Sequence, residues 1–208
     1  MLALPRLRML ALLIIALPPA LVEAGNLNLS QFSPADQSFS LSLPAEPVVH
    51  ERKTWFPISR FVTRIYTSQV DGEEFGINYT QLPRLIGWLS SDRMILNSAR
   101  DGMLGDSQAT LVSLKKFKVR NQPAQAMVFS IPAQDGLPEL MGQARLLMTG
   151  NRLYILWTET TPAVSDSSLA EFFASFRIGD WTPFAENAAP IKPPADEDPA
   201  AGHSPAPQ

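Results

Sequence analysis

The chain has 208 residues, of which 17 are Lys or Arg and 20 are Asp or Glu, so its formal net charge is −3 at pH 7. A chain so close to neutrality lacks the basic surface by which proteins bind nucleic acid or anionic lipid. It contains no Cys, which excludes disulfide bonds, thiol catalysis and thiolate metal sites.

The first 24 residues have the pattern of a secretory signal peptide. Arg6 and Arg8 precede an apolar run over 9–17, and Ala24 marks the expected cleavage site. An uncleaved membrane anchor is the alternative, but a run of about nine residues is well short of a membrane span. We therefore expect a signal peptide over 1–24, a linker over 25–37, and a periplasmic or secreted protein of a bacterium. No stable membrane insertion is expected after cleavage.

Three stretches then alternate apolar and polar residues with the period of a half-buried strand. They are the segments 39–43, 61–66 and 75–79, and Pro44 ends the first of them. Asp71-Gly72, between the second and the third, is a strong hairpin signal. These features predict three consecutive antiparallel strands.

The apolar period changes after residue 90. Ser90 or Ser91 can cap a helix, because a Ser side chain accepts a hydrogen bond from a free backbone N–H of the first turn. One helical stripe follows at four-residue spacing: Ile95, Ala99 and Met103. The spacing predicts a helix over about 91–103, with Gly105 as its stop.

Four more strands follow in the sequence. The first runs over 111–119, and residues 121–123 form the turn into the second. Gly150-Asn151 is a two-residue hairpin turn between the last two. The last strand is apolar on both faces: Leu153, Ile155 and Trp157 alternate with Tyr154 and Leu156. We therefore expect this strand to be central and covered on both sides.

The final apolar pattern is helical. Leu169, Phe172, Phe173 and Phe176 lie at i, i+3, i+4 and i+7, which predicts a helix over 167–176. The simplest interpretation is a lid over the preceding strand, and the alternative is an aromatic box for a cofactor. Residues 182–208 are rich in Pro and Ala, and we expect a disordered tail because they cannot bury enough apolar surface to offset their ordering entropy.

Three segments resemble the PsbP-like family, which shares its fold with the Mog-type proteins and with many exported bacterial proteins. They are FSLSLPAEP over 39–47, GNRLYILWTE over 150–159 and LAEFFASFRI over 169–178. The resemblance implies an antiparallel sheet flanked by helices, and an accessory or binding role rather than catalysis. It implies no functional residue, because no ligand-binding motif of the family matches this chain. We expect one α+β domain over 38–181, with a sheet of about six or seven strands in an αβα sandwich.

Candidate catalytic and metal-binding residues are few. His50, beside Glu51, is the only His in the predicted domain, and no second ligand lies at a spacing typical of zinc sites. We interpret it as an exposed loop residue. The chain has no G-x-S-x-G motif and no Gly-rich phosphate loop. The nearest carboxylate sets are Glu73-Glu74 and Asp101/Asp106, which we interpret as turn or solvated residues. We expect no enzyme activity, no cofactor and no metal.

The one run of charge is basic and consists of Lys115, Lys116, Lys118 and Arg120. Lys116, Lys118 and Arg120 share one face of the predicted strand. The run can protect a sheet edge against aggregation, or it can bind an acidic protein partner. We expect a partner-binding protein, with carriage of a small ligand in an apolar cleft between sheet and helix as the alternative, and an unrecognised enzyme as the third.

Overall fold

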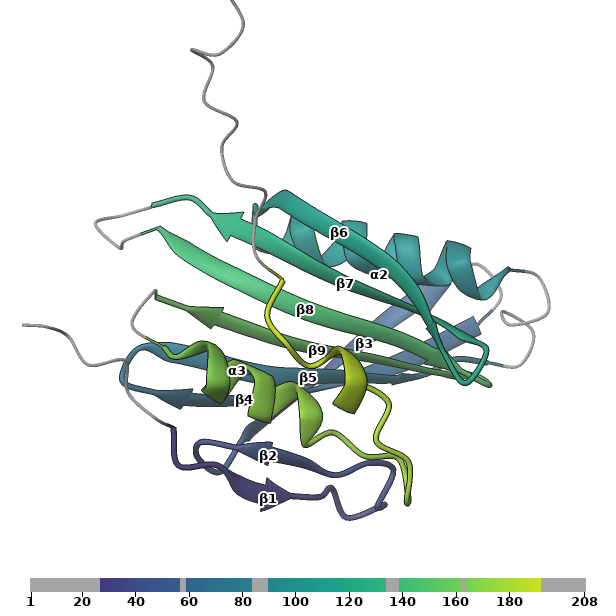
Figure 1. The fold of residues 1–208 in the computed structure, drawn as a ribbon. Coiled ribbons are helices and arrows are strands. Elements are labelled where there is room, and N and C mark those ends of the chain that lie inside the picture. Colours follow the sequence, from purple (N-terminus) through teal and green to yellow (C-terminus); the bar gives the residue numbers. More distant parts are fainter. Residues whose placement is uncertain (1–26, 57–58, 84–89, 134–138, 162–163, 192–208) are drawn as a thin grey trace, which may run out of the picture.

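The computed structural model describes residues 27–56, 59–83, 90–133, 139–161 and 164–191. Among them, a seven-stranded antiparallel sheet forms the centre of the fold, in the order β3-β4-β5-β9-β8-β7-β6 (Figure 1). Its strands are β3 (Val48–Phe56), β4 (Ser59–Val70), β5 (Glu73–Gln81), β6 (Thr110–Val119), β7 (Gln122–Ile131), β8 (Leu140–Thr149) and β9 (Arg152–Thr160). The predicted α+β class and antiparallel sheet are confirmed.

Tight turns join neighbouring strands at the predicted positions or within one residue of them. Asp71 and Gly72 both have positive φ, at 50° and 84°, as a two-residue hairpin turn requires. Gly150 has φ 57° between β8 and β9. The β6–β7 turn lies one residue earlier than expected, because Arg120 and Asn121 take the positive φ values.

One face of the sheet, here called the α3 face, is covered by helix α3 (Asp166–Ala174), a short helix η1 (Ala185–Asn187) and a two-stranded sheet. The two strands are β1 (Ser30–Phe32) and β2 (Leu41–Leu43). The predicted strand over 39–43 therefore pairs with β1 and not with the strand over 61–66, so the prediction of three consecutive antiparallel strands is wrong for the first of them. Ser165 caps α3 by accepting a hydrogen bond from the Ser168 N–H at 3.2 Å. The three predicted Phe side chains, Phe172, Phe173 and Phe176, are fully buried in this layer. Phe176 packs on Tyr154 of β9, so the predicted lid over that strand is confirmed.

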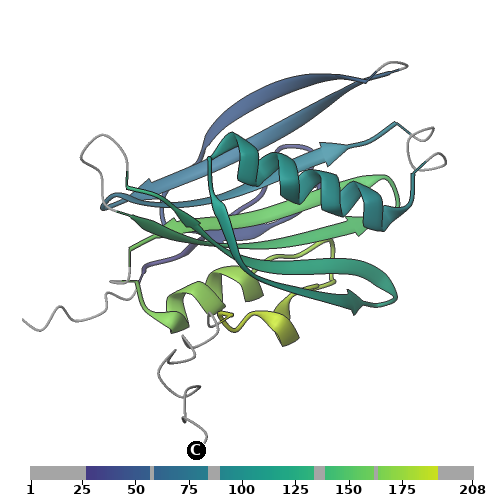
Figure 2. The same ribbon diagram turned by 90° about the horizontal axis from the view of Figure 1, so that it is seen from above.

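The opposite face, here called the α2 face, carries helix α2 (Asp92–Asp106) (Figure 2). Ser91 is its N-cap and accepts from the Met94 N–H at 3.3 Å. Leu96 is 1% exposed and packs against the sheet. The helix passes the predicted stop at Gly105 by one residue. On β9, Ile155 lies in the α2-face core and Leu156 in the α3-face core, which confirms a central strand covered on both sides.

Three differences from the sequence prediction concern the edges of the domain. His50 lies in edge strand β3 rather than in a loop, because residues 48–56 pair along their length with β4. The expected linker over 25–37 contains β1, whose Phe32 packs against the core. The expected tail begins later than residue 182, since Phe184 is fully buried on the α3 face.

A buried arginine holds this last segment on the sheet. Arg145 of β8 is 0% exposed and donates to the backbone carbonyls of Asn187 at 3.3 Å and Ala189 at 3.0 Å. Its guanidinium lies 4.4 Å from the ring centroid of Phe173. Burial lowers the pKa of Arg145 to about 10. The predicted signal peptide over 1–24 and the tail beyond 191 lie outside the described residues.

Candidate functional site

Helix α2 leaves a cleft on each of its long sides. It contacts β7 and β8, which lie toward one edge of the sheet. The part of the α2 face formed by β3, β4, β5 and β9 therefore extends past the helix. In Figure 2 the β3–β4 ribbon rises beside α2 and borders this uncovered part.

The first cleft, here called the apolar groove, lies between α2 and that uncovered part of the sheet. Its volume is about 460 Å³. Its apolar lining includes Ile95, Ala99 and Met103 from the helix, and Phe61, Ile65 and Ile155 from the sheet. The predicted stripe of α2 thus faces a groove as well as the core.

Several of the polar groups that line the apolar groove already have hydrogen-bond partners. The hydroxyls of Thr63 and Thr80 lie 2.7 Å apart, and Asn78 Oδ1 accepts from the Trp157 indole N–H at 3.0 Å. At the rim, Arg52 forms an ion pair with Asp106.

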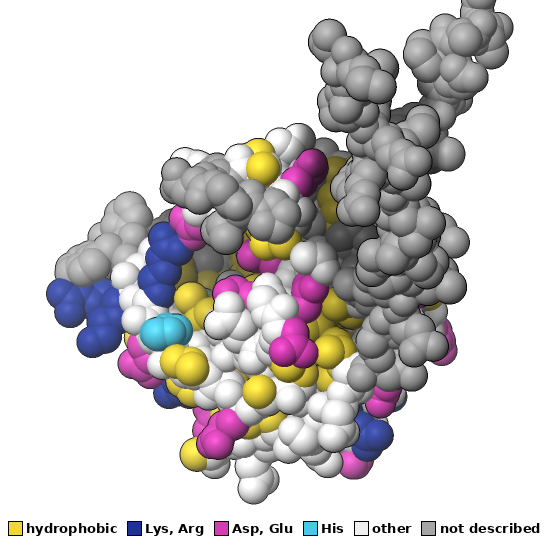
Figure 3. All heavy atoms as spheres, turned by 90° about the vertical axis from the view of Figure 1, so that its left-hand side faces the viewer, with side chains coloured by type: hydrophobic (Ala, Val, Ile, Leu, Met, Phe, Trp, Pro, Cys, Tyr) yellow, Lys and Arg dark blue, Asp and Glu magenta, His cyan; other side chains and the backbone are white. Residues whose placement is uncertain are grey.

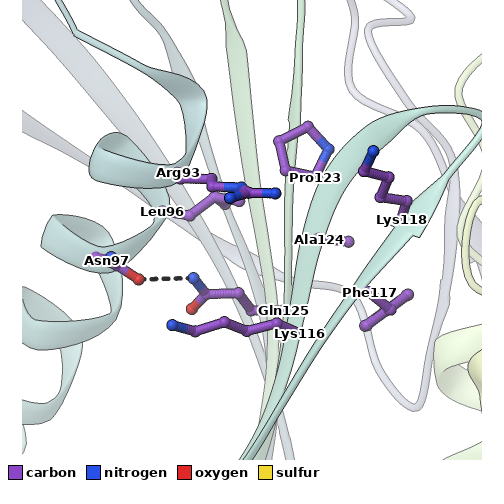
Figure 4. Close-up of a pocket in the computed structure, with 9 residues that line it drawn as sticks. All are labelled: Arg93, Leu96, Asn97, Lys116, Phe117, Lys118, Pro123, Ala124 and Gln125. Carbon is purple, nitrogen blue, oxygen red and sulfur yellow. Dashed lines mark hydrogen bonds between the residues drawn. The ribbon is translucent and has the colours of Figure 1, made fainter.

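The second cleft, here called the basic pocket, lies on the other side of α2, and its volume is about 380 Å³. Its lining is shown in Figure 4: Arg93, Leu96 and Asn97 of α2, Lys116, Phe117 and Lys118 of β6, and Pro123, Ala124 and Gln125 of β7. Two of the four sequence-predicted basic residues therefore lie in a cleft. Arg93 of α2, which is not among the predicted site residues, lines the same pocket.

The other two predicted residues lie elsewhere. Lys115 alternates with Lys116 along β6 and so belongs to the α3 face. The guanidinium of Arg120 lies 5.1 Å from the ring centroid of Trp181, which packs against the α3-face core. The expectation that Arg120 shares a face with Lys116 and Lys118 is wrong, because the left-handed turn at residues 120 and 121 redirects its side chain.

The remaining candidates for catalysis or metal binding are either exposed or already paired with neighbouring groups. His50 is exposed on the edge strand, and no group of three or more His, Asp or Glu side chains suited to a metal ion occurs within the described ranges. Glu73 accepts from the N–H of Thr161 at 2.7 Å and from its hydroxyl at 2.5 Å. Asp101 pairs with Arg100, and Asp106 pairs with Arg52, so these two do not form a carboxylate pair.

One carboxyl group has a strongly perturbed acidity. Glu159 lies opposite Glu74 near the end of β9. Burial, reinforced by the Glu74 charge, raises the pKa of Glu159 to about 7. Figure 3 shows the end of the molecule at which β5 begins and β9 ends, where Asp and Glu side chains are spread around hollows lined by hydrophobic side chains. Glu159 is not among the site residues that the sequence predicts.

No helix in the described parts of the chain has the length and apolar character needed to span a bilayer. No family model matches the chain, and no curated protein matches it. Among solved structures, it is similar to cyanobacterial PsbP (CyanoP) from Synechocystis sp. PCC 6803, with 13% identity and a TM-score of 0.49 over 79% of this chain and 98% of that chain. It is also similar to PA94 of Pseudomonas aeruginosa, described as a protein of unknown function and putative regulator, with 14% identity and a TM-score of 0.31 over 67% of this chain and 85% of that chain.

Proposed function

We propose that this protein is an exported, non-catalytic binding protein that receives a segment of a protein partner in the apolar groove beside α2. The observation that carries the proposal is the open groove of about 460 Å³, with largely apolar walls in which Thr63, Thr80 and Asn78 already have hydrogen-bond partners. Export is proposed from the signal pattern over 1–24.

The surroundings of the apolar groove favour a protein over a small molecule. Met94, which lines the groove, is 51% exposed, so its apolar side chain is open to contact with a partner. Protein interfaces combine a side chain inserted in a pocket with flatter contacts around it. Small-molecule sites, by contrast, enclose most of the ligand surface. A partner that inserts an apolar side chain beside Ala99 and covers Met94 uses both features.

Carriage of a small apolar ligand is the second candidate, and the groove volume favours it because ligand sites measure roughly 300–1,000 Å³. This cleft lies beside α2, on the opposite face of the sheet from α3. The Phe172, Phe173 and Phe176 side chains are fully buried and occupy the space beneath α3 themselves.

Two glycines of α2 offer a matched test. Gly102 lines the apolar groove and Gly105 does not, and a Cβ added at either would meet no atom within 4 Å. Gly102→Phe should occupy the groove, while Gly105→Phe makes the same change outside it. Both variants gain helix propensity over glycine, by about 0.5 kcal/mol, so folding should persist.

The assay is crosslinking in intact cells followed by capture of the full-length protein. We expect a protein partner to be captured by the wild type and by Gly105→Phe, and to be lost with Gly102→Phe. Organic extraction and mass spectrometry of the same samples test the second candidate, which predicts a small apolar molecule with the same dependence on Gly102. Equal capture by both variants would overturn the assignment of the groove.

A further inference from the structure

The basic pocket on the other side of α2 has features that binding in the apolar groove does not require. It is built from three separate elements, α2, β6 and β7. In Figure 4, Arg93 extends from the helix toward β7, and Lys116 extends from β6 back toward the helix beside Gln125. Three elements therefore aim polar side chains into one space of about 380 Å³.

The charge of this pocket has one sign. Arg93, Lys116 and Lys118 are its charged lining residues, and no Asp or Glu lines it. None of the three forms an ion pair with another described residue, whereas Arg52, Arg64 and Arg100 all do. Three cations gathered around one cavity repel one another, and an anion placed between them removes that repulsion.

Gln125 adds a second, independent observation. Its side chain is 3% exposed, and its Nε2 donates to Asn97 Oδ1 at 2.9 Å. Asn97 Oδ1 also accepts from Arg100 Nη1 at 3.4 Å, so the Asn97 oxygen must face both donors and the orientation of both amides is fixed. The carbonyl oxygen of Gln125 is then left with no hydrogen-bond partner among the described residues. A buried acceptor of this kind is available to a donor from outside the chain, either a water molecule or a ligand hydroxyl.

We propose that the basic pocket binds a small polyanion that carries a hydroxyl group, with the anionic groups on Arg93, Lys116 and Lys118 and the hydroxyl donating to Gln125 Oε1. Sugar phosphates and hydroxylated polycarboxylates share this chemistry. Charged donors and anionic acceptors make the strongest hydrogen bonds. Discrimination for the hydroxyl follows because a ligand without it leaves the Gln125 oxygen unpaired.

The pocket suits a small ligand better than an acidic protein surface. A protein surface could satisfy exposed lysines, but it has no need of an amide that is 3% exposed behind them. The whole chain is acidic, with a net charge of −3, so it offers little long-range attraction to a polyanionic macromolecule. The positive charge is local, and Lys116 lies beside the buried amide (Figure 4).

The test is calorimetric titration of the full-length protein at low ionic strength with four probes. Citrate and tricarballylate are tricarboxylates that differ only in the hydroxyl, and glycerol 3-phosphate is compared with inorganic phosphate. We expect citrate to bind about tenfold more tightly than tricarballylate, because only citrate can pair the buried acceptor. The stronger of the citrate and glycerol phosphate signals identifies the natural anionic group as carboxylate or phosphate.

Matched variants locate the site. Lys116→Gln and Lys118→Gln should each weaken binding about tenfold, whereas Lys115→Gln, on the other face of the same strand, should not. Gln125→Met should abolish the preference for citrate over tricarballylate. Since Lys116 and Lys118 line an open pocket, their variants should fold even if the Gln125 variant does not. Gly102→Phe, which changes the apolar groove and not the basic pocket, should leave the affinity for citrate unchanged. The two proposals can therefore fail independently of each other.

Several results would overturn the proposal. They are absence of heat from all four probes at millimolar concentration, equal affinity for citrate and tricarballylate, and equal weakening by Lys115→Gln and Lys116→Gln. Capture of an acidic protein through Lys116 and Lys118, without binding of any probe, would also overturn it.

Discussion

Replacing Glu159 by Gln is expected to stabilise the protein at neutral pH and to flatten its pH dependence. Glu159 lies between Glu74 of β5 and Gly142 of β8 on the α2 face. Burial, and to a smaller extent the Glu74 charge, raises the pKa of Glu159 from 4.5 to about 7. An ionised carboxylate at this position therefore costs free energy, and an uncharged amide of the same shape does not.

The sign and size of the effect follow from proton binding. Between pH 4.5 and pH 7 the folded state holds the Glu159 proton more tightly than the unfolded state, so the free energy of unfolding falls as pH rises through this window. One pKa unit corresponds to about 1.4 kcal/mol, which sets a ceiling of about 3 kcal/mol at pH 8. Because Glu159 is only partly buried, screening by solvent reduces the expected change to about 1–2 kcal/mol.

Urea unfolding at pH 5, 6, 7 and 8 measures this contribution directly. The stability of Glu159→Gln relative to the wild type should rise from pH 5 to pH 8. Glu171→Gln, on the exposed side of α3, is the control for loss of a carboxylate. A difference between Glu159→Gln and the wild type that is the same at pH 5 and pH 8 would refute the reasoning.

Three further substitutions test the packing of the sheet by urea unfolding. Arg145→Ala should cost about 3 kcal/mol or more, because it leaves a cavity and frees two carbonyls of the 185–191 segment, whose amide exchange should then accelerate. Gly142→Ala should cost about 1–3 kcal/mol, because an added Cβ would overlap the Phe129 ring; an unchanged midpoint would contradict this packing. Ser165→Ala should cost about 1 kcal/mol through loss of the α3 cap, and no loss would mean that the cap is dispensable.

The elements that could be predicted from sequence are those whose periodicity reflects burial. Strand β9 is apolar on both faces because a layer packs on each, and the Phe-rich stripe of α3 is apolar because it is covered by the sheet. Strand β3 could not be predicted from the sequence because it lies at the edge of the sheet, where its first residues are not covered. Its Val48, Val49 and His50 are all exposed, so burial imposes no alternation on them.

The basic pocket could be predicted only in part. A run of Lys along one segment is visible in the sequence, and alternation along a strand places Lys116 and Lys118 on one side of it. Arg93 lies in a different element, and only the packing of α2 on the sheet brings it near them. Gln125 had a readable signal, since it is a lone polar residue within the apolar run of β7, where a buried polar group is usually functional or paired.

The strand order has a consequence for how the chain folds. Strands β3, β4 and β5 pair through successive hairpins, and so do β6, β7, β8 and β9, which makes two meanders with local connections. Within the described strands, the two meanders pair with each other only through β5 and β9, as in the register of Ile77 with Leu156. Closing that pair spans about half of the domain sequence, the longest separation of any paired strands in the described residues, so its loop-closure entropy cost is the largest. Each meander can form early, and the β5–β9 seam is expected to set the folding rate of the domain.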